Sequence, residues 1–326
     1  MDNPTIAEIG NEPRFVQMPA GPARRAHQEL LDGLQAPQAR IAPKFLYDAL
    51  GSSLFTAITQ LPEYYPTRCE AEIFDTHGPD IARQVGPLHA MIDLGAGDCS
   101  KAQRLLEYLQ PLQYVPIDIS ADYLQDAAVR LHTLHPELDI LALGLDFSES
   151  LALPASVHPK RRLFIYPGSS IGNLDASQAL AMLERIRANC PGGGLLVGVD
   201  RVKPRGILEP AYDDALGVTA AFNLNLLRHV NAMADTDFRV EDWKHVAFYN
   251  PALERVEMHL EARREVDVSW PGGHRTFARA ERIHTESSYK YRPERFADML
   301  ERAGFSDIRH WSDERAWFSV FHARAS

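Results

Sequence analysis

The chain has few cysteines, no long apolar run and no signal sequence. Its three cysteines, Cys69, Cys99 and Cys190, are an odd number spread over 326 residues, which argues against a disulfide framework. No apolar stretch is long enough to cross a bilayer. The N-terminus lacks the basic start and apolar run of a signal peptide. We therefore expect a cytoplasmic protein that is not held in a membrane.

Metal-binding clusters and excess positive charge are also missing. The 13 histidines are scattered, and the close pair His132 and His135 has no cysteine or carboxylate partner at metal-ligand spacing, so we predict no metal site. The net charge is -10, from 44 acidic and 34 basic residues. Such a chain is repelled by phosphate backbones and anionic lipid, although the charge also serves solubility alone. We predict a small-molecule partner, no nucleic acid, no membrane, and a monomer.

Short apolar runs alternate with helical patterns through the middle of the chain. The runs lie at 89–94, 114–117, 140–145, 163–166 and 195–199. Strands that alternate with helices form a parallel sheet covered on both faces, with right-handed crossovers. A helix at 294–303 and strands at 307–311 and 316–322 complete this sheet at the C-terminus. We predict an α/β, Rossmann-like fold with a doubly wound, mostly parallel seven-stranded sheet.

The rhythm changes after Asp200 and points to a second domain. Residues 256–262 alternate apolar and polar side chains with period two, which is typical of an antiparallel strand with one wet face. We assign residues 69–201 and 291–326 to the large domain, and residues 22–68 and 202–290 to a smaller α+β domain. Residues 1–25, with four prolines, are predicted to be an irregular arm. Thr67-Arg68-Cys69-Glu70 resembles a capping box and predicts a helix from there to about residue 85.

A glycine turn follows the first predicted strand of the sheet. In Asp93-Leu94-Gly95-Ala96-Gly97 the two glycines allow a ligand to approach the backbone closely. Ser100 stands where a dinucleotide fingerprint has its third glycine, and the Asp93 carboxylate would repel a pyrophosphate. A nicotinamide oxidoreductase is therefore the less favoured interpretation of this turn.

Acidic residues end three successive predicted strands. Asp93 is placed to bind the cationic aminoacyl end of S-adenosylmethionine, and Asp118 to accept both ribose hydroxyls. Asp146 is placed to accept from the adenine amino group, with the Phe147 ring on the adenine face, and Lys101 to bind the cofactor carboxylate. Each alone has an ordinary alternative as a cap, a turn or a solvated side chain. Together, at the ligand-binding edge of one sheet, they favour S-adenosylmethionine as cofactor, with S-adenosylhomocysteine as its product.

Longer segments carry a more specific signal. They are KFLYDALGS at 44–52, LPEYYPTR at 61–68, GSSIGNL at 168–174, AYDD at 211–214, GVTAAFN at 217–223 and TESS at 285–288. In these segments the chain resembles the histidine Nα-methyltransferase family of ergothioneine biosynthesis, from about residue 25 to the end. The resemblance implies a class I methyltransferase fold with a separate substrate domain. It also implies three successive methyl transfers to the α-amino group of L-histidine, giving hercynine.

The same resemblance implies roles around the substrate amine and carboxylate. Asn173 and Tyr212 would hold the carboxylate, and Asn173 would also lie near the amine. Tyr47 and Tyr64 would line the amine and imidazole end, which makes Tyr47, Tyr64 and Asn173 the implied catalytic residues. The alternative for the two tyrosines is an aromatic seam between helices. No histidine–carboxylate pair presents itself as a base, so we expect the ammonium proton to leave to water or to a tyrosine-linked water.

The imidazole end is implied to rest on Glu286, Ser288 and Met258. Glu286 can accept from a ring N–H, whereas Ser288 can donate or accept. Met258 would pack on the ring, with plain core packing as its alternative. A site of this kind rejects a ligand that lacks the ring nitrogens, because its buried polar groups would be left unpaired. Two other hypotheses remain: a methyltransferase for another amino acid or small amine, and a non-catalytic cofactor-binding subunit, which needs no such second pocket.

Overall fold

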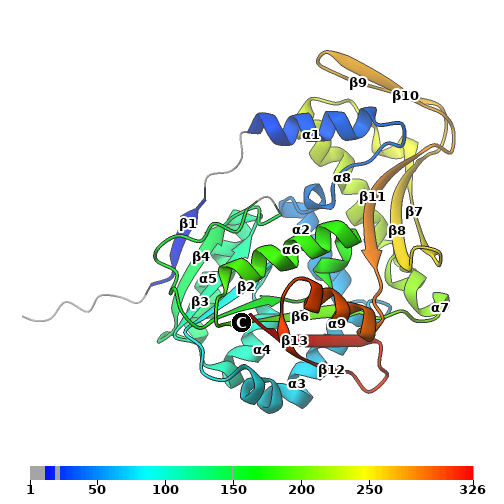
Figure 1. Cartoon of the computed structure of the whole chain (residues 1–326). Helices are drawn as coiled ribbons and strands as arrows, with labels where there is room; N and C mark the ends of the chain where they lie inside the picture. Colours follow the sequence, from blue (N-terminus) through cyan, green and yellow to red (C-terminus); the bar gives the residue numbers. More distant parts are fainter. Residues whose placement is uncertain (1–11, 19–22, 149, 326) are drawn as a thin grey trace, which may run out of the picture.

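The large sheet of the protein has eight strands. The structure is a computed structural model that describes residues 12–18, 23–148 and 150–325. The strand order is β1-β4-β3-β2-β5-β6-β13-β12 (Figure 1). The strands are β1 (Arg14–Gln17), β2 (Ala90–Leu94), β3 (Gln113–Asp118), β4 (Asp139–Gly144), β5 (Arg162–Tyr166), β6 (Gly194–Asp200), β12 (Ser306–Ser312) and β13 (Phe318–Arg324).

Strand direction makes this the predicted doubly wound sheet. β1 to β6 pair in parallel, and β13 runs antiparallel to both of its neighbours, β6 and β12. Every residue of β2 and β6 is buried, as apolar strands covered on both faces must be. The order reverses between β2 and β5, so the carboxyl ends of these strands border the crevice where such sheets bind ligands.

Helices cover both faces of the large sheet. Buried residues of α3 (Tyr65–Val85), α4 (Ser100–Leu109) and α5 (Ala121–Leu134) pack on one face. Those of α6 (Ala176–Asn189) and α9 (Pro293–Arg302) pack on the other. Helices on both faces leave the strand ends as the edge where a ligand can bind, so we expect the predicted cofactor at the loops after the strands.

Two details of the N-terminal half differ from the prediction. Arg14–Gln17, expected in an irregular arm, forms β1, and this eighth strand pairs in parallel with β4. A strand of four residues is too short to read from periodicity, and it forms because it covers the otherwise open edge of β4. Helix α3 begins at Tyr65 rather than at the predicted capping box near Thr67. Pro66 lies in its first turn, where the missing N–H breaks no helical hydrogen bond.

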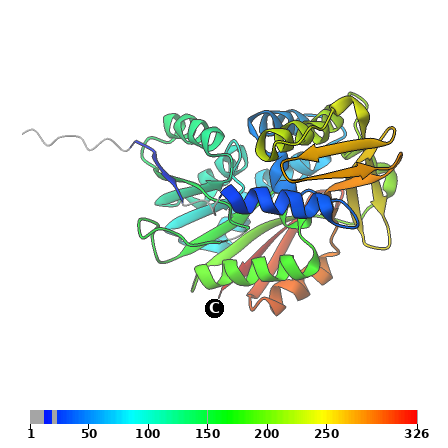
Figure 2. The ribbon, with the colours of Figure 1, turned by 90° about the horizontal axis from the view of Figure 1, so that it is seen from above.

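A smaller antiparallel assembly lies beside the large sheet, as predicted (Figure 2). Its sheet has the order β11-β8-β7, and a separate hairpin pairs β9 with β10. Helix α8 packs against the sheet and against α1 and α2. The elements are α1 (Ala23–Gln35), η1 (Pro43–Leu46), α2 (Ala49–Thr59), α7 (Arg205–Leu208), η3 (Glu209–Ala211), α8 (Val218–Ala234), η4 (Val240–Asp242), β7 (Trp243–Asn250), β8 (Arg255–Ala262), β9 (Val266–Trp270), β10 (Gly273–Phe277) and β11 (Arg282–Tyr289).

Candidate active site

The glycine turn after β2 meets the end of β3 directly. Gly95 and Gly97 have φ values of 73° and 53°, in the left-handed region that favours glycine. The Gly97 N–H donates to Asp118 Oδ2 at 3.0 Å, and the Ser120 N–H donates to Asp118 Oδ1 at 2.9 Å. Each carboxylate oxygen of Asp118 keeps a lone pair for a further donor, which suits the ribose hydroxyls expected at this strand end.

Asp93 is a buried carboxylate with one oxygen left over. Its side chain is at the end of β2, 1% exposed, and its Oδ2 accepts from the Tyr114 hydroxyl at 2.7 Å. Among the described residues and their contacts, Asp93 Oδ1 has no hydrogen-bond partner. Burial raises the pKa of Asp93 to about 7, although the Tyr114 hydrogen bond and the charge of Lys101 act in the opposite direction. A buried, unpartnered acceptor fits the cationic aminoacyl end of S-adenosylmethionine.

Asp146 and Phe147 lie after β4, as predicted, but Asp146 has a partner that the sequence did not suggest. Its Oδ2 accepts from Lys44 Nζ at 3.0 Å, and Lys44 is also 3.0 Å from Glu29 of helix α1. Despite partial burial, the hydrogen bonds from Ser148 and Lys44 hold the pKa of Asp146 below its usual range. Lys44 thus ties the N-terminal helix to the strand end where the adenine amino group is expected.

Lys101, expected to bind the cofactor carboxylate, is paired with a buried acid. Its Nζ lies 3.2 Å from Oε2 of Glu70, which is 1% exposed. The Gly168 N–H donates to the same carboxylate, at 2.8 and 3.0 Å to its two oxygens. A Cβ on Gly168 would lie 2.3 Å from Lys101 Nζ, so the loop after β5 and the lysine pack closely. Glu70 was missed because a glutamate inside a helix carries no signal of burial.

Aromatic side chains from α2, α8 and the residues next to η1, α3 and η3 meet in one group. The Tyr47 ring centroid lies 5.6 Å from those of Phe55 in α2 and Phe222 in α8. The Tyr64 ring, before α3, lies 6.4 Å from that of Tyr212. Burial raises the pKa of the Tyr47, Tyr64 and Tyr212 hydroxyls well above 10, and the Glu286 carboxylate adds to the effect at all three. Because the Phe55 ring also lies 6.1 Å from that of Tyr64, these three predicted residues belong to one aromatic group.

Tyr47 joins this aromatic group to the cofactor edge. Its pKa is raised by the charge of Asp118 as well as by burial and Glu286. The Ser120 hydroxyl donates to the Tyr47 carbonyl at 2.9 Å, while the Ser120 N–H holds Asp118. Ser120 therefore links the backbone of Tyr47 to Asp118, so a predicted substrate residue lies next to the strand end where the ribose is expected.

Glu286, Ser288 and Met258 share one face of the small sheet. Glu286 and Ser288 lie two residues apart on β11, and Met258 on β8 is the direct cross-strand neighbour of Glu286. Within the described part of the chain, no side-chain hydrogen bond reaches the Glu286 carboxylate, which is 7% exposed. Burial raises its pKa to about 7, while the charge of Lys290 acts to lower it. A buried carboxylate without a donor from the protein can accept a hydrogen bond from a ligand N–H.

Beneath this face lies a buried charge network that the sequence analysis missed. Asp200, at the end of β6, accepts from the Tyr65 hydroxyl at 2.6 Å and pairs with Lys203 and Lys290. Although burial acts to raise the pKa of Asp200, the charges of Lys290 and Lys203 hold it below its usual range. Lys290 also donates to the hydroxyls of Tyr212 and Ser288, each at 2.8 Å. A lysine beside a polar strand is normally exposed to solvent, so nothing in its sequence position reveals this burial.

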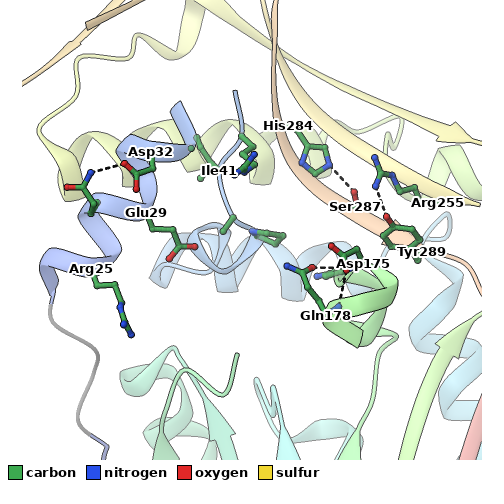
Figure 3. Close-up of a pocket in the computed structure, with 16 residues that line it drawn as sticks. Arg25, Glu29, Asp32, Ile41, Asp175, Gln178, Arg255, His284, Ser287 and Tyr289 are labelled. Carbon is green, nitrogen blue, oxygen red and sulfur yellow. Dashed lines mark hydrogen bonds between the residues drawn. The ribbon is translucent and has the colours of Figure 1, made fainter. Parts of the chain in front are cut away.

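Asn173, also predicted at the substrate carboxylate, lies in the segment after β5. It ends the short helix η2 (Ser170–Asn173), which packs against β11, and lines an open cavity of about 840 Å³. Ser287 and Tyr289, on the face of β11 opposite Glu286, line the same cavity (Figure 3). Among the described residues, no hydrogen bond or ring contact joins the Asn173 side chain to Tyr64, Tyr212 or Glu286, so its role at the carboxylate stays a prediction.

The fold and its ligand edge define a class I, S-adenosylmethionine-dependent methyltransferase. More narrowly, the chain belongs to the family described as histidine-specific, S-adenosylmethionine-dependent methyltransferases, whose sequence model matches residues 26–325. The chain is 38% identical to the histidine N-alpha-methyltransferase of Mycolicibacterium smegmatis, over 91% of this chain and 94% of that protein. It is also 38% identical to the enzyme of the same name from Mycobacterium tuberculosis, over 90% and 92% of the two chains. These matches confirm the predicted family and cofactor.

A third relative is more distant and much longer. Ergothioneine biosynthesis protein 1 of Neurospora crassa is 28% identical to the chain over 82% of this chain, which spans 31% of that protein.

In the described part of the structure, no helix is long and apolar enough to cross a membrane. Nor do three histidine, cysteine, aspartate or glutamate side chains of the described residues gather where they would hold a metal ion.

Proposed function

We propose that the chain transfers methyl groups from S-adenosylmethionine to the α-amino nitrogen of L-histidine, three in succession, to give hercynine in ergothioneine biosynthesis. The observation that carries the proposal is the buried Glu286 carboxylate, which has no described partner and lies beside Ser288 and Met258. An ionised carboxylate accepts one ring N–H, a hydroxyl can serve the second ring nitrogen, and a thioether packs against the ring face. Family membership supports histidine as the acceptor.

We propose a division of labour between the two parts of the chain. Residues 69–201 and 291–326 would bind the cofactor, and residues 22–68 and 202–290 would bind the amino acid. Tyr212 and Asn173 would hold the substrate carboxylate. Separate sheets for the two groups of residues support this division, because the large sheet ends at Asp200 and resumes at Ser306.

The bound cofactor supplies a methyl group that its sulfonium already activates, so the protein has mainly to orient and desolvate the amine. The nitrogen must be a neutral amine, because an ammonium has no lone pair. The raised pKa values of Tyr47 and Tyr64 keep both phenols protonated at neutral pH. They would therefore orient the amine by hydrogen bonds rather than remove its proton, which would leave to water. The unpartnered Asp93 oxygen and Asp118 would hold the cofactor at the strand ends.

The decisive experiment is one incubation of the chain with S-adenosylmethionine and L-histidine, read by mass spectrometry. We expect products heavier by one, two and three methyl groups, with the trimethylated product accumulating. A panel of other amino acids and small amines in parallel tests the second candidate, a related acceptor. No gain on histidine, with a gain on a panel member, would transfer the proposal to that acceptor.

A further inference from the structure

Lys290 is a buried cation whose hydrogen bonds are all accounted for. It directly follows β11, and its side chain is 0% exposed. Its Nζ lies 2.9 Å from Asp200 Oδ2, 2.8 Å from the Tyr212 hydroxyl and 2.8 Å from the Ser288 hydroxyl. An ammonium has three N–H donors and no acceptor, so these three contacts use all of them.

The saturated ammonium restricts what the two hydroxyls can do. Tyr212 Oη and Ser288 Oγ must both act as acceptors toward Lys290, which leaves each of them one proton to donate. The two oxygens lie 2.7 Å apart, so in the free protein one of these protons is shared between them. Both protons become available to a ligand when that shared bond is given up, and Lys290 remains as donor to both oxygens.

We infer that Lys290 is a positioning residue for the amino-acid substrate: anchored by Asp200, its ammonium only donates hydrogen bonds and so turns the hydroxyl protons of Tyr212 and Ser288 outward toward two acceptors of the ligand. The inference rests on the proposed function, in which those acceptors are the substrate carboxylate and the unprotonated ring nitrogen. Glu286 takes the remaining ring N–H. The pocket then holds two donors and one acceptor in fixed order, which matches the neutral side chain and the carboxylate of histidine.

Lys203 provides a matched control for the role of Lys290. It is also buried and also pairs with Asp200, on the other carboxylate oxygen. Its Nζ also donates to the Tyr65 hydroxyl at 2.9 Å and to the Arg201 carbonyl at 2.7 Å, and neither residue is predicted to bind the substrate. Removing either lysine therefore takes one positive charge from the same carboxylate and leaves the other in place. Only the loss of Lys290 releases Tyr212 and Ser288.

The test compares Lys290→Met with Lys203→Met in the whole chain, by calorimetry in the presence of S-adenosylhomocysteine. The ligands are histidine and histamine, which is histidine without its carboxylate. Losing a charged donor to two buried hydroxyls should weaken histidine binding by about 10- to 100-fold in Lys290→Met. Histamine binding should fall by a clearly smaller factor, because it has no carboxylate for Tyr212. Lys203→Met should bind histidine much more like the wild type, and both variants should bind S-adenosylhomocysteine normally.

Two results would overturn the inference. The first is that Lys290→Met and Lys203→Met bind histidine with the same affinity. The second is that Lys290→Met loses affinity for histidine and for histamine by the same factor, which indicates a merely structural role. If Lys290→Met does not fold, Lys290→Gln keeps a polar head beside Asp200 and undergoes the same comparison with the same criteria. If the wild-type chain methylates histidine and either of these results is found, the inference fails while the proposed function stands. A wild-type chain that does not methylate histidine overturns the proposed function and the inference with it.

Discussion

Replacing Glu286 by glutamine removes a titrating carboxylate from the pocket while it keeps a carbonyl oxygen of nearly the same position and size. The carboxylate is buried, has no hydrogen-bond partner among the described residues, and has a pKa raised by burial to about 7. We expect it to accept an N–H of the substrate imidazole as an ionised carboxylate, which is the stronger acceptor. Its proton must then leave whenever histidine binds below that pKa.

This requirement sets the size and sign of a pH effect. At pH 8 Glu286 is already ionised in the free protein, and exchanging its charged hydrogen bond for a neutral one should weaken histidine binding by about 1–2 kcal/mol. At pH 6 the wild-type protein must first lose the proton, which costs about tenfold in affinity for a pKa one unit above the pH. Glu286→Gln has no such cost. The dissociation constant of Glu286→Gln for histidine, divided by that of the wild type, should therefore shrink by about tenfold from pH 8 to pH 6.

The assay is calorimetric titration of histidine at several pH values, with S-adenosylhomocysteine present throughout. Ionisation of histidine itself cancels in the ratio, because both proteins receive the same ligand. Glu257→Gln is the control, since Glu257 is also 7% exposed but lies on the opposite face of the small sheet, bonded to Arg255 and His259. The dissociation constant of Glu257→Gln for histidine, divided by that of the wild type, should be the same at every pH. A ratio that is flat, or that grows toward low pH, would refute the reasoning and show that Glu286 does not receive a neutral imidazole.

The same substitution has a consequence for stability. The unfolded chain ionises Glu286 near its ordinary pKa of 4.5, whereas the folded protein keeps the proton up to about pH 7. The folded state thus binds more protons in this window, so stability falls as the pH rises through it and the full cost is present above pH 7. The difference corresponds to about 3 kcal/mol. Glu286→Gln should therefore be more stable than the wild type at pH 8 in urea denaturation, and the gain should vanish near pH 4.

Three further predictions concern the cofactor edge, the amine and the aromatic group. Asp93→Asn should weaken S-adenosylhomocysteine binding by about 1–3 kcal/mol in calorimetry, because the buried unpartnered oxygen loses its charge, and unchanged affinity would remove Asp93 from the cofactor site. Tyr64→Phe should slow methyl transfer to histidine by about tenfold at unchanged cofactor affinity, because one hydrogen bond to the amine is lost. If the variant performs each of the three transfers at the wild-type rate, a direct role of the hydroxyl is excluded. Phe222→Ala removes a 2%-exposed ring beside Tyr47 and should cost about 3–5 kcal/mol in chemical denaturation, and a cost below about 1 kcal/mol would show that the ring is dispensable.

Much of the cofactor edge could be predicted from local patterns. Asp93, Asp118 and Asp146 each follow a short apolar run, and parallel strands bring their carboxyl ends to one edge whatever the details of packing. The eighth strand was missed, since Arg14–Gln17 forms only because β4 offers an open edge. The start of α3 was misplaced by two residues, because Pro66 suits the first turn of a helix as well as the extended segment before one.

The acceptor site divides differently between sequence and tertiary structure. Family resemblance in several segments of the sequence pointed to the acceptor-site residues, since no periodicity links positions so far apart. They are Tyr47, Tyr64, Tyr212, Glu286 and Ser288. Their sequence alone determined the chemical types available: a carboxylate, hydroxyls and aromatic rings. Only the tertiary structure decided that Glu286 is buried without a partner, because desolvation depends on what the fold places around a side chain.

The glycine turn and the alternation of strands and helices could be predicted from the sequence, because backbone conformation and the pattern of apolar and helical segments are local properties. The charge network of Asp200, Lys203 and Lys290 belongs to the tertiary structure. A lysine in a chain is an ordinary polar residue, and it becomes a fixed donor only when three acceptors close around it in a space without water. In this protein those acceptors come from β6, β11 and the residue after η3, and no local pattern relates them.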